Sequence, residues 1–527
     1  MSASSGPAAT TQPAERQQWS GQIGFIISAI GSAVGLGNIW RFPGVAYENG
    51  GGAFMIPYLI ALLTAGIPIL LLDYAIGHRF RGSAPLAFRR LKKWLESLGW
   101  FQVMICVFIA IYYAVILAWA ASFFVFSFGQ KWGDDPSSFF YGDYLHLADT
   151  AGFSSDYISG IVIPLAAIWV LTIAVLALGV AKGLEKANII FIPLLVVAFG
   201  ALVVRAVTLE GAADGLNALF TPDWSKITDA SVWIAAYSQI FFSLSIAFGI
   251  MVTYSSYRRR RSNQTTPGLV VGFANSSFEL LAGIGVFSIL GFMAHEQGIA
   301  VSELSGLKGT SLAFITFPKA ISQMPSAAWL FGALFFASLF LAGFTSLISI
   351  VEVVSAGFQD KFGWSYRKAA VSIGVVLGII SVALFSSATG LYTLDVMDNW
   401  ANNFCVVLSA IVMSIAVVWV LRRGRELAFH LSSLSTFKVK TTWLALIGVV
   451  APVMLLYMFV QTVYSLVTEG YDPAYDAWFE GLFGWGTVVA CVVGAAVMTA
   501  LRWKHDPDRF EPWPPYAAPP ARLTAGK

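Results

Sequence analysis

The sequence predicts an all-α polytopic membrane protein with about twelve transmembrane helices. Of its 527 residues, 57% are hydrophobic and only 12% are charged, and the mean hydropathy is +0.72. Runs of about 20 apolar residues, the length that crosses a bilayer, recur along most of the chain. The formal net charge of +3 says little by itself, and we expect no nucleic-acid partner.

Twelve apolar segments can be placed along the chain. They lie at roughly 22–47, 53–77, 100–128, 157–180, 187–208, 230–256, 267–294, 328–358, 369–389, 396–421, 441–467 and 478–501. The first twenty residues lack the basic region and short apolar core of a cleaved signal peptide, so we expect the first segment to be retained.

Connections rich in basic residues alternate along the chain with connections rich in acidic residues. Clusters such as Arg89 to Lys93, Arg258 to Arg261 and Arg422 to Arg425 follow even-numbered segments, whereas the other connections carry mostly acids. Because cytoplasmic loops carry the excess of Lys and Arg, both termini are predicted to be cytoplasmic.

The first apolar segment contains an irregular stretch from Gly31 to Pro43. Three glycines lower its helical stability, while Asn38 and Arg41 bring an amide and a charge to membrane depth. This pattern indicates a broken helix whose backbone coordinates a ligand. The alternative is a small-residue packing face, since Gly31 and Gly35 also fit G-x-x-x-G.

The sixth segment is weakened in the same way between Gln239 and Gly249, five segments later. Paired weak segments in two halves of a chain are typical of transporter sites built on inverted repeats. The alternative is that its serines only bond to their own helix carbonyls. The sequence contains no Cys/His cluster, nucleophile elbow or phosphate loop, so we do not expect an enzyme.

Two long motifs carry a resemblance to a known family. The motif GNIWRFP at 37–43 is followed by ENGGGAF at 48–54. With them, the chain from Arg16 to the last segment resembles the neurotransmitter:sodium symporter family, close to its bacterial LeuT-like amino acid transporters. The resemblance implies a LeuT-like 5+5 inverted repeat with helices 1 and 6 broken. The expected units are 1–18 (disordered, cytoplasmic), 19–208 (first repeat), 230–421 (second repeat), 441–501 (helices 11 and 12) and 502–527, a cytoplasmic tail whose proline content predicts disorder.

The resemblance also implies two Na⁺ sites. In the first, the carbonyl of Ala33, the side chains of Asn38, Ser243 and Asn275, and the substrate carboxylate would surround the ion. In the second, the ligands would be the carbonyls of Gly31, Val34 and Ala342 with the hydroxyls of Thr345 and Ser346. Such all-oxygen shells suit a hard cation.

The implied substrate is a neutral, aliphatic amino acid such as Ala, Val, Leu or Met. Tyr113 would hydrogen-bond its carboxylate and Phe248 would close over it. Gly35 stands where monoamine-carrying relatives place an aspartate, and Ala247, where many relatives have glycine, would shrink the pocket. The residues expected to line the pocket are Ser32, Ala33, Gly35, Ile109, Tyr113, Phe242, Ser243, Ser245, Phe248, Ser346 and Ile350.

Glu279 occupies the position where chloride-dependent members of the family have serine. Its carboxylate would replace chloride beside Tyr58, Gln239, Ser243 and Asn275, and would take up a proton in the return step. The resemblance therefore implies chloride-independent transport. The alternative is a buried glutamate kept neutral by desolvation.

The resemblance further implies gates on both sides of the site. Arg41 and Asp398 would approach each other through water on the outer side. Arg16 and Asp360 would pair at the cytoplasmic end, with Trp19 and Tyr257 packed nearby. Gly183 and Pro193 match the family's Gly-x9-Pro hinge in the fifth helix.

The first hypothesis is thus a sodium-coupled amino acid symporter of a bacterial inner membrane, working by alternating access. The second is an amino acid-binding sensor on the same scaffold that does not complete transport. The sequence leaves open which amino acid is bound, the Na⁺ stoichiometry, proton counter-transport and the oligomeric state. A membrane enzyme lacks any catalytic constellation, and a continuous channel conflicts with gates on both sides.

Overall fold

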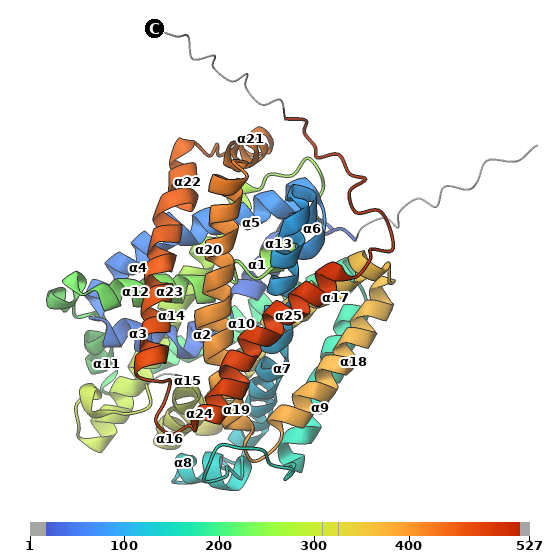
Figure 1. Ribbon diagram of the computed structural model, residues 1–527. Helices are drawn as coiled ribbons and strands as arrows, with labels where there is room; N and C mark the ends of the chain where they lie inside the picture. The colour runs from blue at the N-terminus through green and yellow to red at the C-terminus, as the bar shows by residue number, and fades with distance from the viewer. Residues whose placement is uncertain (1–16, 308, 325, 517–527) are drawn as a thin grey trace, which may run out of the picture.

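The computed structural model describes residues 17–307, 309–324 and 326–516. This part of the chain is almost entirely helical and contains no β-strand (Figure 1). The helices of the first half are α1 (Gln22–Ala33), α2 (Leu36–Trp40), α3 (Phe42–Glu48), α4 (Met55–Ala61), α5 (Ile67–Phe80), α6 (Ala84–Leu91), α7 (Glu96–Ser127), α8 (Pro136–Ser138), α9 (Ser159–Ala177), α10 (Glu185–Ala206), α11 (Ala212–Phe220), α12 (Ala230–Ser243) and α13 (Ile250–Ser256).

The second half continues in the same all-helical way. Its helices are α14 (Thr265–Gln297), α15 (Gly309–Ser311), α16 (Phe317–Ser322), α17 (Ala328–Phe362), α18 (Tyr366–Phe385), α19 (Gly390–Asn399), α20 (Val407–Ile415), α21 (Gly424–Leu434), α22 (Thr441–Ala445), α23 (Ala451–Thr468), α24 (Ala477–Phe479) and α25 (Gly486–Ala500). Short π-helical turns continue several of them, including η5 (Val180–Leu184) before α10 and η9 (Trp400–Val406) between α19 and α20.

Ten of the described helices are long and apolar enough to cross a membrane, and a bent pair makes an eleventh candidate. The bent pair joins α1 to the segment Leu36–Glu48 at an angle of 54°. The apolar stretch predicted at 230–256 forms two helices, α12 and α13, on either side of a non-helical segment at 244–249. The prediction of a polytopic all-α membrane protein is confirmed.

Both predicted helix breaks are present. α1 ends at Ala33, and Val34 leaves the helical region with φ −73° and ψ 103°. In the second break, Ser245 and Ala247 take positive φ values of 52° and 65°, which are uncommon for residues with a Cβ. Gly249 follows with φ +89°, a conformation that glycine adopts readily.

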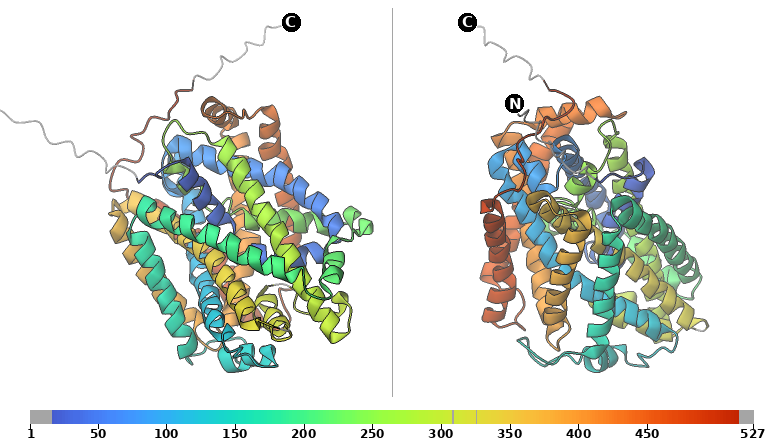
Figure 2. Two further views of the ribbon diagram at one scale, coloured as in Figure 1. Left: turned by 180° about the vertical axis from the view of Figure 1, so that it is seen from behind. Right: turned by 90° about the vertical axis from the view of Figure 1, so that its right-hand side faces the viewer.

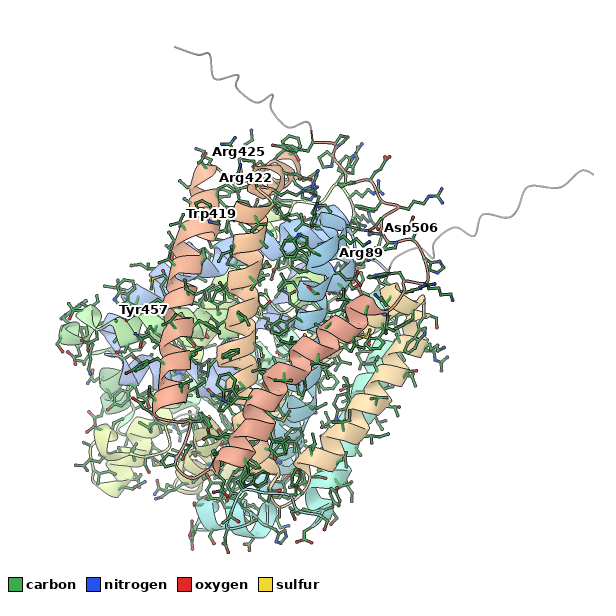
Figure 3. The ribbon with its side chains drawn as sticks, viewed as in Figure 1. Arg89, Trp419, Arg422, Arg425, Tyr457 and Asp506 are labelled. Carbon is green, nitrogen blue, oxygen red and sulfur yellow. The ribbon has the colours of Figure 1, made fainter. Side chains whose placement is uncertain are left out.

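The two ends of the bundle differ in charge. Arg89, Arg422 and Arg425 lie at the end that carries α6 and α21, which we call the basic end (Figure 3). The opposite end carries α8, α11 and α24, and we call it the acidic end because Asp134, Asp214 and similar acids lie there. Between the two ends, the long helices α7 and α17 pack together, while α9 and α18 lie side by side at one edge (Figure 2).

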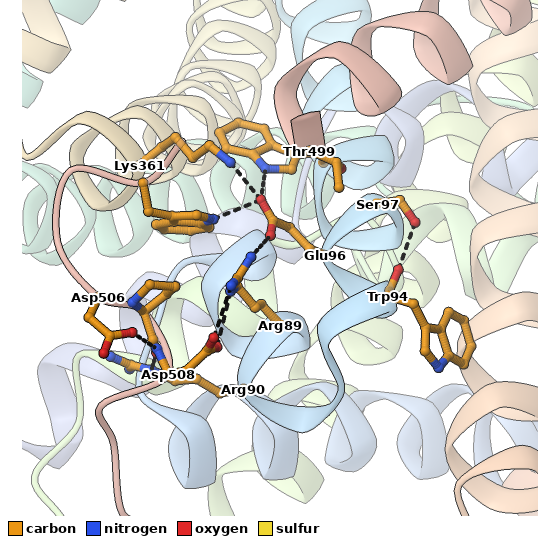
Figure 4. Close-up of polar contacts among 12 residues, drawn as sticks. Arg89, Arg90, Trp94, Glu96, Ser97, Lys361, Thr499, Asp506 and Asp508 are labelled. Atoms are coloured by element: carbon orange, nitrogen blue, oxygen red, sulfur yellow. Dashed lines mark hydrogen bonds and ion pairs between the residues drawn. The ribbon is translucent and has the colours of Figure 1, made fainter. Parts of the chain in front are cut away.

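The tail after α25 differs from the disorder predicted for 502–527. Its described part runs along the basic end up to Tyr516 and contacts the bundle. Trp503 Nε1 donates to Glu96 Oε1 at 2.9 Å, and Asp508 accepts two hydrogen bonds from Arg89, at 3.1 and 2.9 Å (Figure 4). Proline content alone predicted disorder, whereas an indole and a carboxylate give this segment specific partners.

Glu96 is the centre of that contact and is almost fully buried. Lys361 Nζ lies 2.7 Å from its Oε1 and Arg89 Nη1 lies 2.6 Å from its Oε2. We expect Glu96→Gln to lower the free energy of unfolding by about 3 kcal/mol, because it leaves the buried Lys361 charge without its counter-ion. Thermal unfolding followed by tryptophan fluorescence in detergent measures this. The matched control is Glu210→Gln, whose carboxylate is 87% exposed beside His295; equal effects of the two substitutions would contradict the prediction.

The Asp508 contact should depend on pH. Hydrogen bonds from Arg89 hold the pKa of Asp508 below its usual value. A carboxyl with a lowered pKa contributes stability that is full above its unfolded pKa and is lost as the pH falls through the folded pKa. We therefore expect a spin label at the exposed Arg509 position to become mobile only below about pH 4. In Asp508→Asn the label should be mobile at every pH; a label with the same pH profile in both proteins would refute the role of this carboxylate.

Candidate functional site

The two helix breaks face each other in the middle of the bundle. Ser245 Oγ, in the second break, donates to the carbonyl oxygen of Ser32 at 2.9 Å. Ser346 Oγ, in the middle of α17, donates to the same carbonyl at 3.2 Å. Backbone carbonyls released where α1 ends therefore meet hydroxyl groups from two other segments.

Three of the residues predicted for the first Na⁺ site form one chain of hydrogen bonds. Asn38 Nδ2 donates to Asn275 Oδ1 at 2.8 Å, and Asn275 Nδ2 donates to Ser243 Oγ at 3.0 Å. Asn38 Oδ1 accepts from the backbone N–H of Gly35 at 2.9 Å, which fixes the start of α2. All three side chains are buried. The fourth predicted ligand, Ala33, is buried at the end of α1.

Three of the residues predicted for the second Na⁺ site, Gly31, Val34 and Ser346, also converge. Ser346 Oγ lies 3.4 Å from the carbonyl oxygen of Gly31 and 3.5 Å from that of Val34. The neighbouring Thr345 Oγ1 donates to the carbonyl oxygen of Ala342 at 2.9 Å. This cluster consists of carbonyl and hydroxyl oxygens, the donor set that hard monovalent and divalent cations accept.

The predicted substrate residues surround these clusters. The hydroxyl of Tyr113 accepts from the backbone N–H of Leu36 at 3.2 Å. A Cβ on Gly35 would lie 2.9 Å from Ser346 Oγ and 3.1 Å from Tyr113 Oη, so an aspartate there requires both hydroxyls to move. Among the apolar members of the predicted set, Ile109 on α7, Phe248 in the second break and Ile350 on α17 are buried.

Phe242 occupies a different place from the other apolar members. Its side chain is partly exposed, and the Arg41 guanidinium lies over its ring, 4.7 Å from the ring centre. A Cβ on Gly37 would lie 2.1 Å from the same ring, so a side chain there requires the ring to move. The Phe242 ring thus contacts Arg41 and Gly37, whereas the resemblance assigns the closing side chain to Phe248.

Glu279 lies one helical turn after Asn275 on α14, next to the first cluster. Its Oε2 accepts a hydrogen bond from the hydroxyl of Tyr58, and its Oε1 accepts one from Gln239 Nε2 at 2.6 Å. It is fully buried on α14, the helix that also carries Asn275. A carboxylate therefore stands among the side chains that the resemblance assigns to a chloride ion.

The predicted outer pair does not form a direct ion pair within the described residues. Arg41 Nη2 donates to Ser238 Oγ at 3.2 Å, and Asp398 Oδ1 accepts from Asn402 Nδ2 at 2.8 Å. Both Arg41 and Asp398 are partly exposed. The water expected between them and the gating role both stay predictions.

At the basic end, the aromatic side chains predicted to pack together are in contact. Trp19 is buried, donates from Nε1 to the carbonyl oxygen of Tyr254 at 2.8 Å, and packs edge-on against Tyr257 at 6.1 Å between ring centres. Asp360 Oδ2 accepts from the backbone N–H of Ser83 at 2.7 Å. The predicted partner of Asp360, Arg16, lies outside the described residues.

The predicted hinge lies at the start of the fifth helix. Gly183 falls within the π-helical turn η5, and a Cβ there would lie 1.9 Å from the carbonyl oxygen of Val175. Pro193 lies inside α10, which continues to Ala206. The structure places both residues as expected, and their role as a hinge stays a prediction.

Sequence reasoning missed two residues that shape the second break. Asp73 on α5 accepts from the backbone N–H of Ala247 at 3.0 Å, and Ser409 on α20 donates to the carbonyl oxygen of Ala247 at 2.7 Å. Both side chains are fully buried. Asp73 could have been found from sequence, since an acidic residue inside an apolar segment is rare and marks function.

Broken helices that face each other inside a polytopic bundle define the class of membrane transporters with a central substrate site. A profile described as "Sodium:neurotransmitter symporter family" matches residues 16–134 and 130–506. The chain belongs to this family, and the predicted resemblance is confirmed.

Individual relatives agree with the family. An uncharacterized sodium-dependent transporter of Methanocaldococcus jannaschii is 40% identical over 457 residues, which cover 87% of this chain and 92% of that protein. The sodium- and chloride-dependent GABA transporter 2 of Bos taurus is 29% identical over 522 residues, and that of Homo sapiens is 28% identical over 521 residues. Each comparison covers 91% of this chain and 85% of the relative. This chain is therefore a sodium-dependent transporter of the family.

Proposed function

We propose that this protein is a symporter that imports a neutral, aliphatic amino acid together with Na⁺ by alternating access. The observation that carries the proposal is the pair of oxygen clusters at the break in α1, one around Asn275 and the other around Ser346. The first cluster would hold Na⁺ through Ala33, Asn38, Ser243 and Asn275, and the substrate carboxylate would complete its shell.

Shared coordination gives the coupling a physical cause. A carboxylate that ligates the first Na⁺ raises the affinity for the ion, and the ion raises the affinity for the carboxylate by the same factor. The second Na⁺ would bind where α1 meets α17, so that its binding holds the two helices together. Amino acid and ion would then move in one cycle.

The gates support alternating access. Trp19 and Tyr257 pack together at the basic end, while Arg41 and Asp398, both partly exposed, form no direct ion pair with each other within the described residues. Opening and closing the two ends in turn would expose the site to one side of the membrane at a time. With the basic residues on the cytoplasmic side, the packed aromatic side chains would form the cytoplasmic gate.

The proposed anion requirement differs from that of the mammalian relatives. Their names state chloride dependence. In this chain, the Glu279 carboxylate would supply the negative charge beside Tyr58 and Gln239, and would take up a proton when the empty carrier returns. Transport would therefore proceed without chloride.

Uptake into proteoliposomes tests the proposal. We expect an inward Na⁺ gradient to drive accumulation of labelled alanine, valine, leucine or methionine in chloride-free gluconate buffer. Competition with all twenty amino acids and with GABA identifies the substrate. Binding without accumulation would favour a sensor on the same scaffold, and loss of uptake without chloride would refute the role of Glu279.

A further inference from the structure

A polar side chain outside both oxygen clusters connects α10 to the break in α1. Asn188 lies one turn into α10 and is fully buried. Its Nδ2 donates to the carbonyl oxygen of Leu184, the last residue of the turn η5, at 2.8 Å. Its Oδ1 accepts no hydrogen bond from any described residue. One end of this amide is therefore satisfied, and the other is a buried oxygen without a donor.

The unsatisfied oxygen packs against Gly31. A Cβ built on Gly31 would lie 2.1 Å from Asn188 Oδ1, so a residue with a side chain does not fit there unless Asn188 moves. The carbonyl oxygen of the same glycine lies 3.4 Å from Ser346 Oγ in the second cluster. Asn188 and Ser346 thus contact Gly31 from two different helices, α10 and α17.

A second contact of the same kind lies nearer the basic end. Glu185 accepts hydrogen bonds from the backbone N–H of Ser20, at 2.9 Å, and from the Ser20 hydroxyl. A Cβ on Gly24 would lie 1.8 Å from Glu185 Oε1. Glu185 and Asn188 are three residues apart on α10, while Gly24 and Gly31 are seven apart on α1, so each pair shares one helix face. The start of α10 is therefore held against α1 at two points.

The orientation of the Asn188 amide would affect the binding of a cation at the Gly31 carbonyl. A buried acceptor without a donor is unfavourable, and in a low-dielectric interior its dipole interacts strongly with a nearby ion. A cation held by the Gly31 carbonyl stabilises an oxygen that points at Gly31. Without the cation, the same oxygen favours a separation of α10 from α1 that lets water reach it.

We propose that Asn188 is a positioning residue for the second Na⁺ site: its Oδ1 favours bound Na⁺ at Gly31, and its Nδ2 ties that state to the closed turn before α10. The inference rests on the proposed function, because it takes the cluster around Ser346 to hold Na⁺. Loss of the ion and opening of the turn that contains Gly183 are then coupled through one side chain.

Binding of radioactive sodium to the purified full-length protein tests this inference without any amino acid. Choline replaces Na⁺ at constant ionic strength. The variants are Asn188→Leu, which removes the oxygen at similar volume, and Asn188→Asp, which places a negative charge there. We expect Asn188→Leu to weaken Na⁺ binding by about fivefold or more, and Asn188→Asp to strengthen it by a similar factor. Should Asn188→Leu fail to fold, Asn188→Ala takes its place with the same expected weakening.

The matched control is Asn49, at the C-terminal end of α3. Its Nδ2 also donates to the carbonyl oxygen four residues earlier, at 2.8 Å. Asn49→Leu and Asn49→Asp should leave Na⁺ affinity unchanged. Changes in the same direction for both Asn188 variants, or no change in either, would show a merely structural side chain and overturn the inference. Absence of Na⁺ binding by the unaltered protein would instead overturn the proposed function.

Discussion

Replacing Asn275 with leucine should abolish Na⁺-driven uptake. The side chain of Asn275 joins Asn38 and Ser243, through hydrogen bonds of 2.8 and 3.0 Å. Leucine has a similar volume but offers no oxygen, so the first cluster loses a ligand and both neighbours lose a partner in a buried site. We expect apparent Na⁺ affinity to fall roughly 100-fold or more, beyond the usual effect of losing a residue that only supports a metal ligand.

The measurement is uptake at rising Na⁺ in proteoliposomes, with substrate binding measured in parallel. Asn403→Leu is the matched control. Asn403 on η9 lies outside both clusters, and its Nδ2 donates to Asn399 Oδ1 at 2.7 Å. This control should retain uptake. Unchanged Na⁺ dependence in Asn275→Leu would refute the assignment of the first site.

The breaks after α1 and after α12 could be predicted from sequence because small and polar residues interrupt apolar segments there. Gly31, Gly35 and Gly37 interrupt an apolar run, and Asn38 and Arg41 are too polar for a lipid-facing helix. The convergence of Gly31 and Val34 with Ser346 could not follow from periodicity, since it joins residues more than 300 positions apart. It came from the family resemblance, and the structure places these atoms together.

The residues that escaped prediction act by bonding to backbone groups. Asp73 and Ser409 bind the N–H and the carbonyl of Ala247, and Asn188 bonds to Leu184. A pattern of side-chain types does not reveal which backbone groups lack partners, because that depends on where a helix breaks. The tail from Trp503 to Tyr516 was missed for a related reason, since its partners lie on α6, α7 and α17.

Substitution of Glu279 should change the anion that transport needs. We expect Glu279→Ser to abolish uptake in chloride-free buffer and to restore a part of it when chloride is added. Serine removes the fixed negative charge and leaves space beside Tyr58 and Gln239, whose N–H and O–H groups lose the carboxylate that now accepts from them. The Tyr58 and Gln239 donors would then lack an acceptor, and Na⁺ bound nearby would lack a negative partner. A small anion in the vacated space would supply both.

Glu279→Gln separates charge from volume in the same assay. Glutamine has the shape of glutamate but no charge, so it fills the site, excludes chloride and should keep uptake low in both buffers. Na⁺ binding carries a positive charge into a fully buried region, and that charge needs a nearby negative partner from the protein or from solution. Because of this need for a negative partner, we expect chloride to stimulate uptake by Glu279→Ser but not by Glu279→Gln. Chloride-independent uptake by both variants would mean that the carboxylate serves only to orient Tyr58 and Gln239.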